Sequence, residues 1–164
     1  MPKTEVLLAS GQEYSLQVGK KGDRKVLLKM MQHAYQEQHP DANLEAIAET
    51  MEQLWSEHTP FWLVLEPHPQ ATVDPLALGC LWIGAVLDPI TGDRCPHVFL
   101  LYVDPQYRRR GLGRALMQHG ETWAIAQGFQ QLGLHVFVEN VPAQSLYQGL
   151  GYGPQSVILQ KTLR

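Results

Sequence analysis

Three consecutive arginines and two glycines lie close together near the middle of the chain, at Arg108–Arg110, Gly111 and Gly113. Arginine presents permanently charged, forked donors that suit phosphate oxygens, and glycine lets a backbone turn tightly and approach a ligand. The residues after Gly113 carry apolar side chains at helical spacing, and the first N–H groups of a helix attract anions because they lack intrahelical partners. This combination predicts a site for phosphate.

The segments on either side of these residues would position such a site. Before them lies VFLLYV at 98–103, a short apolar run typical of a buried strand, and Asp104-Pro105 ends it because proline donates no ladder hydrogen bond. After them a helix is expected to run from Gly113 to Gly128, a residue type that commonly ends helices. A strand, an arginine-glycine turn and a helix N-terminus therefore follow one another.

The composition narrows the class of protein. The 164 residues are 45% hydrophobic and 18% charged, as in an ordinary globular protein, and the formal net charge of −3 makes the positive charge of the arginines a local feature. We expect a small anionic ligand and no nucleic acid. Cys80 and Cys95 form no metal-binding or disulfide pattern, and no apolar run is long enough to span a membrane. A cytoplasmic protein without a metal is the expectation.

Hydrophobic periodicity predicts one α+β domain over residues 1–164, with a mixed, mainly antiparallel sheet flanked by helices. One short strand is expected within 4–18, and helices over about 24–38 and 44–55, with Asp23 and Asn43 as N-caps. The expected strands 61–66, 78–87 and 98–103, with a loop at 67–75 and a turn at 88–96, suggest an antiparallel meander.

Three further elements are expected after the central helix. Residues 132–138 predict a strand that contains His135, and a strand–helix–strand crossover of this length places it parallel to 98–103. A short helix is expected from Asn140 to about Gly149. Residues 155–162 predict a final strand.

Two segments resemble the signatures of the GNAT superfamily of N-acetyltransferases. Arg108-x-x-Gly111-x-Gly113 resembles the acyl-CoA pyrophosphate motif Q/R-x-x-G-x-G/A. Further along, NVPAQSLYQGLGY at 140–152 resembles the second signature, N-x-x-A-x-x-L-Y-x-x-x-G-F/Y. The resemblance extends over about 78–162, because both motifs occur in the family's order on the expected elements. It implies a GNAT-like fold in which two parallel strands splay apart.

The resemblance also implies that acetyl-CoA is the acyl donor. Backbone N–H groups of the arginine-glycine turn would hold its pyrophosphate, the backbone of Leu101 and Val103 its acetyl carbonyl and pantetheine amide, and Asn140 its pantetheine arm. Asn140 is equally well placed to cap the short helix. The residues expected to contact the donor are Leu101, Val103, Arg108, Arg109, Arg110, Gly111, Leu112, Gly113, Arg114, Asn140 and Tyr147.

Two residues are implied to take part in catalysis. Tyr147 would protonate the departing thiolate as a general acid, although a tyrosine that packs on the core explains the same position. Some family members carry a glutamate base on the strand, and His97 occupies that place here, eleven residues before Arg108. Histidine has an ordinary pKa of about 6.5 and suits a base, although a structural histidine remains the alternative.

The expected function is acetyl-CoA-dependent N-acetylation of a primary amine on a small molecule or peptide, by direct nucleophilic attack. The alternative is a non-catalytic acyl-CoA-binding module with a sensing or regulatory role, and Tyr147 favours the enzyme because binding alone needs no acid at the sulfur. The sequence leaves the acceptor open. It also leaves open whether the chain forms a homodimer, for which the final strand offers one place of pairing.

Overall fold

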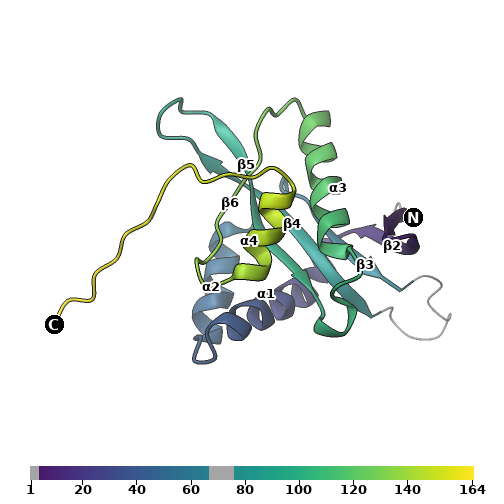
Figure 1. Ribbon diagram of the computed structural model, residues 1–164, viewed down its shortest axis with the longest axis horizontal. Helices are drawn as coiled ribbons and strands as arrows, with labels where there is room; N and C mark the ends of the chain where they lie inside the picture. The colour runs from purple at the N-terminus through teal and green to yellow at the C-terminus, as the bar shows by residue number, and fades with distance from the viewer. Residues whose placement is uncertain (1–3, 67–75) are drawn as a thin grey trace.

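The computed structural model describes residues 4–66 and 76–164 and has a six-stranded sheet at its centre, with strand order β1 to β6 (Figure 1). Neighbouring strands are antiparallel except for the parallel pair β5–β6, which confirms the expected mixed sheet. The strands are β1 (Thr4–Ala9), β2 (Gln12–Val18), β3 (Phe61–Leu65), β4 (Ala77–Leu87), β5 (Arg94–Val103) and β6 (Gly133–Leu134). The expected loop at 67–75 lies outside the described residues.

Helices cover both faces of the sheet. They are α1 (Arg24–Gln38), α2 (Leu44–Leu54), α3 (Leu112–Ala126) and α4 (Val141–Gly149), with single 3₁₀ turns η1 (Lys21–Asp23) and η2 (Pro105–Tyr107). Within the described ranges, no helix combines the length and apolar character needed to cross a membrane.

The central strands β3–β5 are buried on both sides, which holds β5 firmly in place. Leu81 and Ile83 of β4 belong to the core that packs against α3, whereas Cys80 and Trp82, between them in sequence, belong to the core beneath α1 and α2. Alternate residues of a strand point to opposite faces, so each face of β4 supplies one core. The same two cores continue across β5.

The N-terminal region forms a hairpin, not the single strand expected from its weak alternation. β1 and β2 pair along their whole length and are joined by Ser10 and Gly11, with φ angles of 49° and 80°. Two-residue turns with both φ angles positive match the twist of antiparallel strands. The turn at Ser10 lies against Gly111 at the start of α3.

The helix starts agree with the sequence for α2 and α4 and differ from it for α1 and α3. Asn43 caps α2 as expected, because its side chain accepts hydrogen bonds from the N–H groups of Glu45 and Ala46. Asp23 does not cap α1: its carboxylate accepts from the N–H of Lys20 at 2.8 Å and so closes η1 instead. α3 begins at Leu112, which places Gly113 inside the helix.

The β5–β6 pair is parallel, as expected, but much shorter than the sequence suggests. β5 begins at Arg94 because its hairpin with β4 takes in the last three residues of the expected turn, 94–96. Of the predicted strand 132–138 only Gly133 and Leu134 pair, with His97 and Val98. The two strands then diverge, so the rest of the segment has no ladder partner.

The predicted final strand at 155–162 is wrong. Residues 153–164 have no regular secondary structure, and the yellow end of the ribbon runs away from the body of the molecule (Figure 1). A strand is defined by its hydrogen-bonded neighbour, and no strand of the described chain lies beside this segment.

Candidate functional site

The arginine-glycine turn presents unpaired backbone N–H groups at the start of α3. Arg109 and Gly111 both have left-handed backbone angles, with φ of 64° and 77°, and Gly111 is the N-cap residue of α3. The first hydrogen bond of the helix runs from the N–H of Ala115 to the carbonyl of Gly111. The N–H groups of residues 112–114 therefore lack intrahelical partners and suit an anion.

Both glycines of the motif also sit against neighbouring elements. A Cβ atom on Gly111 would lie 2.6 Å from Oγ of Ser10, so the β1–β2 turn touches the arginine-glycine turn. A Cβ atom on Gly113 would lie 3.3 Å from Cδ2 of Leu146, which brings α3 close to α4. The absence of side chains at these positions packs three elements around the start of α3.

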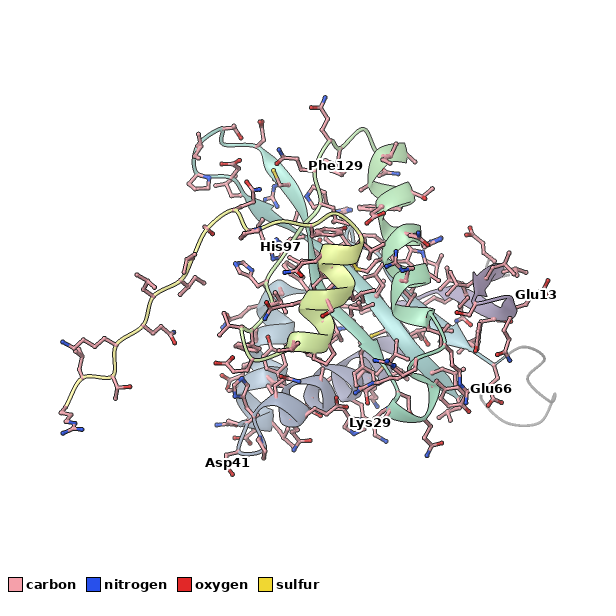
Figure 2. The ribbon with its side chains drawn as sticks, in the orientation of Figure 1. Glu13, Lys29, Asp41, Glu66, His97 and Phe129 are labelled. Carbon is pink, nitrogen blue, oxygen red and sulfur yellow. The ribbon has the colours of Figure 1, made fainter. Side chains whose placement is uncertain are left out.

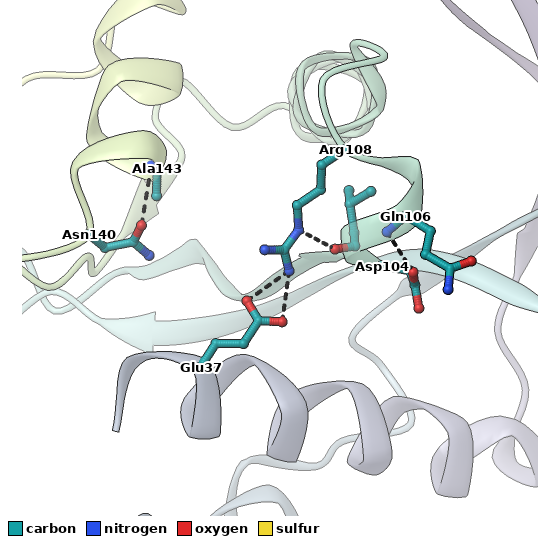
Figure 3. A network of polar contacts seen from close by, with 7 residues as sticks. Glu37, Asp104, Gln106, Arg108, Asn140 and Ala143 are labelled. Carbon is teal, nitrogen blue, oxygen red and sulfur yellow. Dashed lines mark hydrogen bonds and ion pairs between the residues drawn. The ribbon is translucent and has the colours of Figure 1, made fainter. Parts of the chain in front are cut away.

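The Arg108 side chain connects the arginine-glycine turn to β5 and α1 (Figure 3). Its Nε donates to the carbonyl of Val103 at 2.7 Å, and its guanidinium donates to both carboxylate oxygens of Glu37 in α1 at 2.8 and 2.9 Å. Its guanidinium also lies over the ring of Tyr102, 5.6 Å from the centroid. The hydrogen-bonding groups of the Arg108 side chain are thus bound to β5 and α1. Its contact with a phosphate stays a prediction.

The other arginines of the turn are exposed. Arg110 folds back to donate to the carbonyl of Gln106 at 3.2 Å and lies over the ring of Tyr107. Among the described residues, neither Arg109 nor Arg114 makes a side-chain hydrogen bond or ion pair. These two side chains are the ones best placed to meet an anion at the helix start.

β5 presents an open backbone edge beside the turn. The N–H of Asp104 donates to the carbonyl of Leu78 in β4, whereas the carbonyl of Val103 accepts from Arg108 and so faces the other way. Alternate residues of an antiparallel strand direct their backbone groups to opposite edges, so Leu101 shares the orientation of Val103. Within residues 4–66 and 76–164 that edge has no partner strand, because β6 ends at Leu134, opposite Val98.

α4 closes the other side of this gap. The side chain of Asn140 accepts from the N–H of Ala143 at 3.3 Å, so the expected helix cap is present, and its contact with a donor stays a prediction (Figure 3). Tyr147 packs against the core on the α3 side of the sheet, 6.0 Å from the ring of Tyr152. Burial raises the pKa of Tyr147 to about 12, so the phenol keeps its proton at neutral pH.

His97 forms a pair with His135 where β5 meets β6, near the centre of the molecule (Figure 2). Its Nε2 lies 2.8 Å from Nδ1 of His135, and the ring fits above β6 because a Cβ on Gly133 would lie 3.0 Å from its Nδ1. His97 is 8% exposed, and this burial lowers its pKa, with a further decrease from the charge of His135. His97 is therefore neutral at pH 7 and able to accept a proton.

Two residues that contact this site, His135 and Glu37, were not predicted from the sequence. His135, expected inside the sheet, is exposed, and it reaches His97 because β6 turns away from β5 after Leu134. Glu37 lies 71 residues before Arg108 on a helix whose apolar positions alone were informative. Pairs formed by the crossing of distant elements leave no local sequence pattern.

Comparison with known proteins agrees with this geometry. The acetyltransferase (GNAT) family model matches residues 26–152. The chain is 32% identical over 125 residues to a mycothiol acetyltransferase of Beutenbergia cavernae, covering 74% of this chain and 39% of that protein. It is 38% identical over 60 residues to the [ribosomal protein bS18]-alanine N-acetyltransferase of Escherichia coli K12, covering 37% of this chain and 40% of that protein. The chain thus spans well under half the length of these curated relatives.

Solved structures share the fold. A GCN5-related N-acetyltransferase from Ralstonia eutropha JMP134 superposes with a TM-score of 0.69 and 18% identity, covering 91% of this chain and 98% of that one. The AAC(6')-Iy complex with the bisubstrate analogue CoA-S-monomethyl-acetylneamine gives 0.65 and 16% identity, covering 93% and 99%. With the family model matching most of its length, the chain belongs to the GNAT family of acetyltransferases.

Proposed function

We propose that this chain transfers an acetyl group from acetyl-CoA to a primary amine. The observation that carries the proposal is the open edge of β5 between the free N-terminus of α3 and the helix α4 that bears Asn140 and Tyr147. An edge with free backbone groups suits an extended chain that contains amides, and the helix start suits a pyrophosphate. A donor that combines both features fits this arrangement.

The residues present fit acetyl-CoA at each of its parts. The N–H groups at the start of α3, with Arg109 and Arg114, would hold the pyrophosphate. The backbone of Leu101 and Val103 would hold the pantetheine amides and direct the thioester carbonyl. Acetyl-CoA supplies an activated acetyl thioester, and the chain's own residues place it and move protons.

In the proposed reaction a neutral amine attacks the thioester carbonyl, a nitrogen–carbon bond forms and the carbon–sulfur bond breaks. Tyr147 donates its phenolic proton to the leaving sulfur, a role that suits a buried phenol with a raised pKa. The N–H of Leu101 or Val103 at the open edge stabilises the oxyanion that develops. The products are an N-acetylated amine and the free thiol of CoA.

His97 is the proposed base, with His135 as its connection to solvent. One hydrogen lies between His97 Nε2 and His135 Nδ1, so a proton taken up by the buried ring can leave through the exposed one. Because its pKa is lowered, His97 is free to accept a proton throughout the neutral range.

The test is release of CoA thiol from acetyl-CoA in the presence of a panel of amines. The relatives and neighbours suggest two of its members, a peptide with an N-terminal alanine and an aminoglycoside, and free lysine and a polyamine are added. CoA binding is measured separately by calorimetry. Binding without amine-dependent thiol release from any acceptor would favour the non-catalytic acyl-CoA module.

Two variants test the assigned roles. Tyr147→Phe should lower kcat by about 100-fold or more with little change in the KM for acetyl-CoA, the usual size of a general-acid contribution. His97→Ala should remove the acid limb of the pH–rate profile, whose midpoint lies below 6.5 in the wild type. His58→Ala, in the segment between α2 and β3, is the matched control for the histidine. An unchanged acid limb in His97→Ala would exclude it as the base.

A further inference from the structure

A cavity of about 430 Å³ lies where β2, the end of β3, the start of β4 and η2 meet. Glu66, on one of its walls, lies across α3 from α4 and His97 (Figure 2). Of the residues that line it, only Arg110 also belongs to the site proposed for the donor. Small-molecule sites enclose about 300–1,000 Å³, so this second cavity has the size for a compact ligand.

The cavity is lined by one carboxylate and one guanidinium, from Glu66 and Arg110. Tyr107 lies between them, because its hydroxyl donates to Oε1 of Glu66 at 2.7 Å and the guanidinium carbon of Arg110 lies 5.1 Å from the centre of its ring. These contacts keep the two charges within about 11 Å of each other. Within residues 4–66 and 76–164 they nevertheless form no ion pair with each other.

Both charged groups keep capacity for a ligand. Arg110 donates to the carbonyl of Gln106 at 3.2 Å, which uses one of the five N–H donors of its guanidinium. A carboxylate has about four acceptor positions, and the hydroxyl of Tyr107 occupies one of those of Glu66. The cavity can therefore pair a negative group at Arg110 and a positive group at Glu66 in the same ligand.

The floor between these charges is apolar and fixed in place. Leu78 and Tyr14 are 0% and 2% exposed, and both belong to the core that packs against α3. An apolar floor with charged groups at the rim suits a small molecule that combines an apolar part with charges of both signs.

We propose that this cavity binds a free α-amino acid with an apolar side chain, as the zwitterion. Its carboxylate pairs with Arg110, its ammonium with Glu66, and its side chain lies on the floor. The two charged groups of an α-amino acid are adjacent, so with one hydrogen bond of about 2.9 Å at each end the zwitterion spans about 8–9 Å. This span fits the separation of Glu66 and Arg110. Binding of this ligand involves no acetyl transfer.

Other classes of small ligand fit these groups less well. A simple amine or a simple carboxylate leaves one of the two charges without a partner. A nucleotide or another polyphosphate brings several negative charges close to the carboxylate of Glu66, and like charges at short range repel. The pairing of opposite charges across one phenol ring thus selects a compact zwitterion.

Calorimetry on the full chain with L-leucine tests the proposal. Two compounds each lack one charge of leucine: 4-methylpentanoate has no ammonium and 3-methylbutylamine has no carboxylate. L-leucine should bind at least about 10-fold more tightly than either, because each charge-assisted contact contributes to affinity. Amide NMR shifts should change at Leu78 and Tyr107. Absence of leucine binding at millimolar concentration, equal binding of the three compounds, or shift changes confined to other residues would each overturn the proposal.

A charge-neutral variant tests the role of the carboxylate. Glu66→Gln should weaken L-leucine binding by about 10-fold without weakening binding of 4-methylpentanoate. Because both ligands are measured on the same variant, a loss of the contact is distinguished from a loss of folded protein. Glu49→Gln, at an exposed position of α2, is the matched control and should bind leucine like the wild type. The proposal is wrong if Glu66→Gln weakens leucine no more than Glu49→Gln does, or weakens both ligands alike.

Discussion

Gly111 is the residue whose replacement most sharply tests how the anion site is built. Gly111→Ala would place a side chain at a φ of 77°, where an L-residue costs about 1–2 kcal/mol. The new Cβ would also lie 2.6 Å from Oγ of Ser10, and relieving that contact requires the Ser10 side chain to rotate or the β1–β2 turn to move. We expect a total loss of about 2–3 kcal/mol in the free energy of unfolding, by adding about 1 kcal/mol for the overpacking.

The other end of the same helix provides the control. Gly128 has a φ of 86°, but a Cβ there meets nothing within 4 Å, so Gly128→Ala carries the backbone cost alone. Gly111→Ala should therefore lower Tm by about 6–9 °C and Gly128→Ala by about 3–6 °C in a chain of this size. Urea unfolding monitored by tryptophan fluorescence gives the corresponding free energies.

A second substitution isolates the contact between the two turns. Ser10→Ala removes Oγ, and the next nearest atom to the new Cβ of residue 111 is the Ser10 nitrogen at 3.5 Å, an ordinary contact. In the Ser10→Ala background, Gly111→Ala should cost no more than Gly128→Ala. Equal costs of Gly111→Ala in both backgrounds would refute the view that the N-terminal hairpin confines the arginine-glycine turn.

Three further outcomes follow from single contacts. Glu37→Gln breaks the Arg108–Glu37 pair and should lower the free energy of unfolding by less than about 1 kcal/mol, because the two side chains are 40% and 34% exposed. A double-mutant cycle with Arg108→Lys measures their coupling. Burial lowers the pKa of His97 in the folded chain, so as pH falls below about 6.5 the unfolded chain takes up this proton before the folded chain does. The free energy of unfolding should therefore decrease between about pH 6.5 and pH 5, and it should decrease less steeply in His97→Gln. Asn43→Ala should cost about 1 kcal/mol by removing the α2 cap, seen as a lower urea midpoint at unchanged slope.

The sequence predicted the elements that have a local signal. Asn43 and the apolar stripe behind it marked α2, and the apolar run before Asp104 marked the strand at the site, because capping and periodicity act over a few residues. The parallel direction of β6 also followed from chain connectivity. These features need no knowledge of distant partners.

What the sequence missed depends on contacts between distant segments. The runs 132–138 and 155–162 have strand composition, yet only Gly133 and Leu134 pair, because pairing needs a neighbour and composition does not specify one. Asp23 shows the same limit on a smaller scale, because its carboxylate could accept a hydrogen bond from either η1 or α1 and accepts one from the N–H of Lys20 in η1. In the site itself, the contacts of His135 with His97 and of Glu37 with Arg108 depend on how distant elements pack together, which the sequence pattern does not specify.

The short strand β6 determines how far the candidate site opens. Its inner edge holds β5 through only His97 and Val98, and this early divergence leaves the backbone of Leu101 free for a ligand. A ladder this short is weak by itself, so Gly133 and Leu134 rely on the packing around them. The contact between His135 and His97 lies just beyond this ladder, while the gap on the inner side stays open. The incomplete pairing of one two-residue strand is therefore what creates the backbone edge on which the proposed donor would lie.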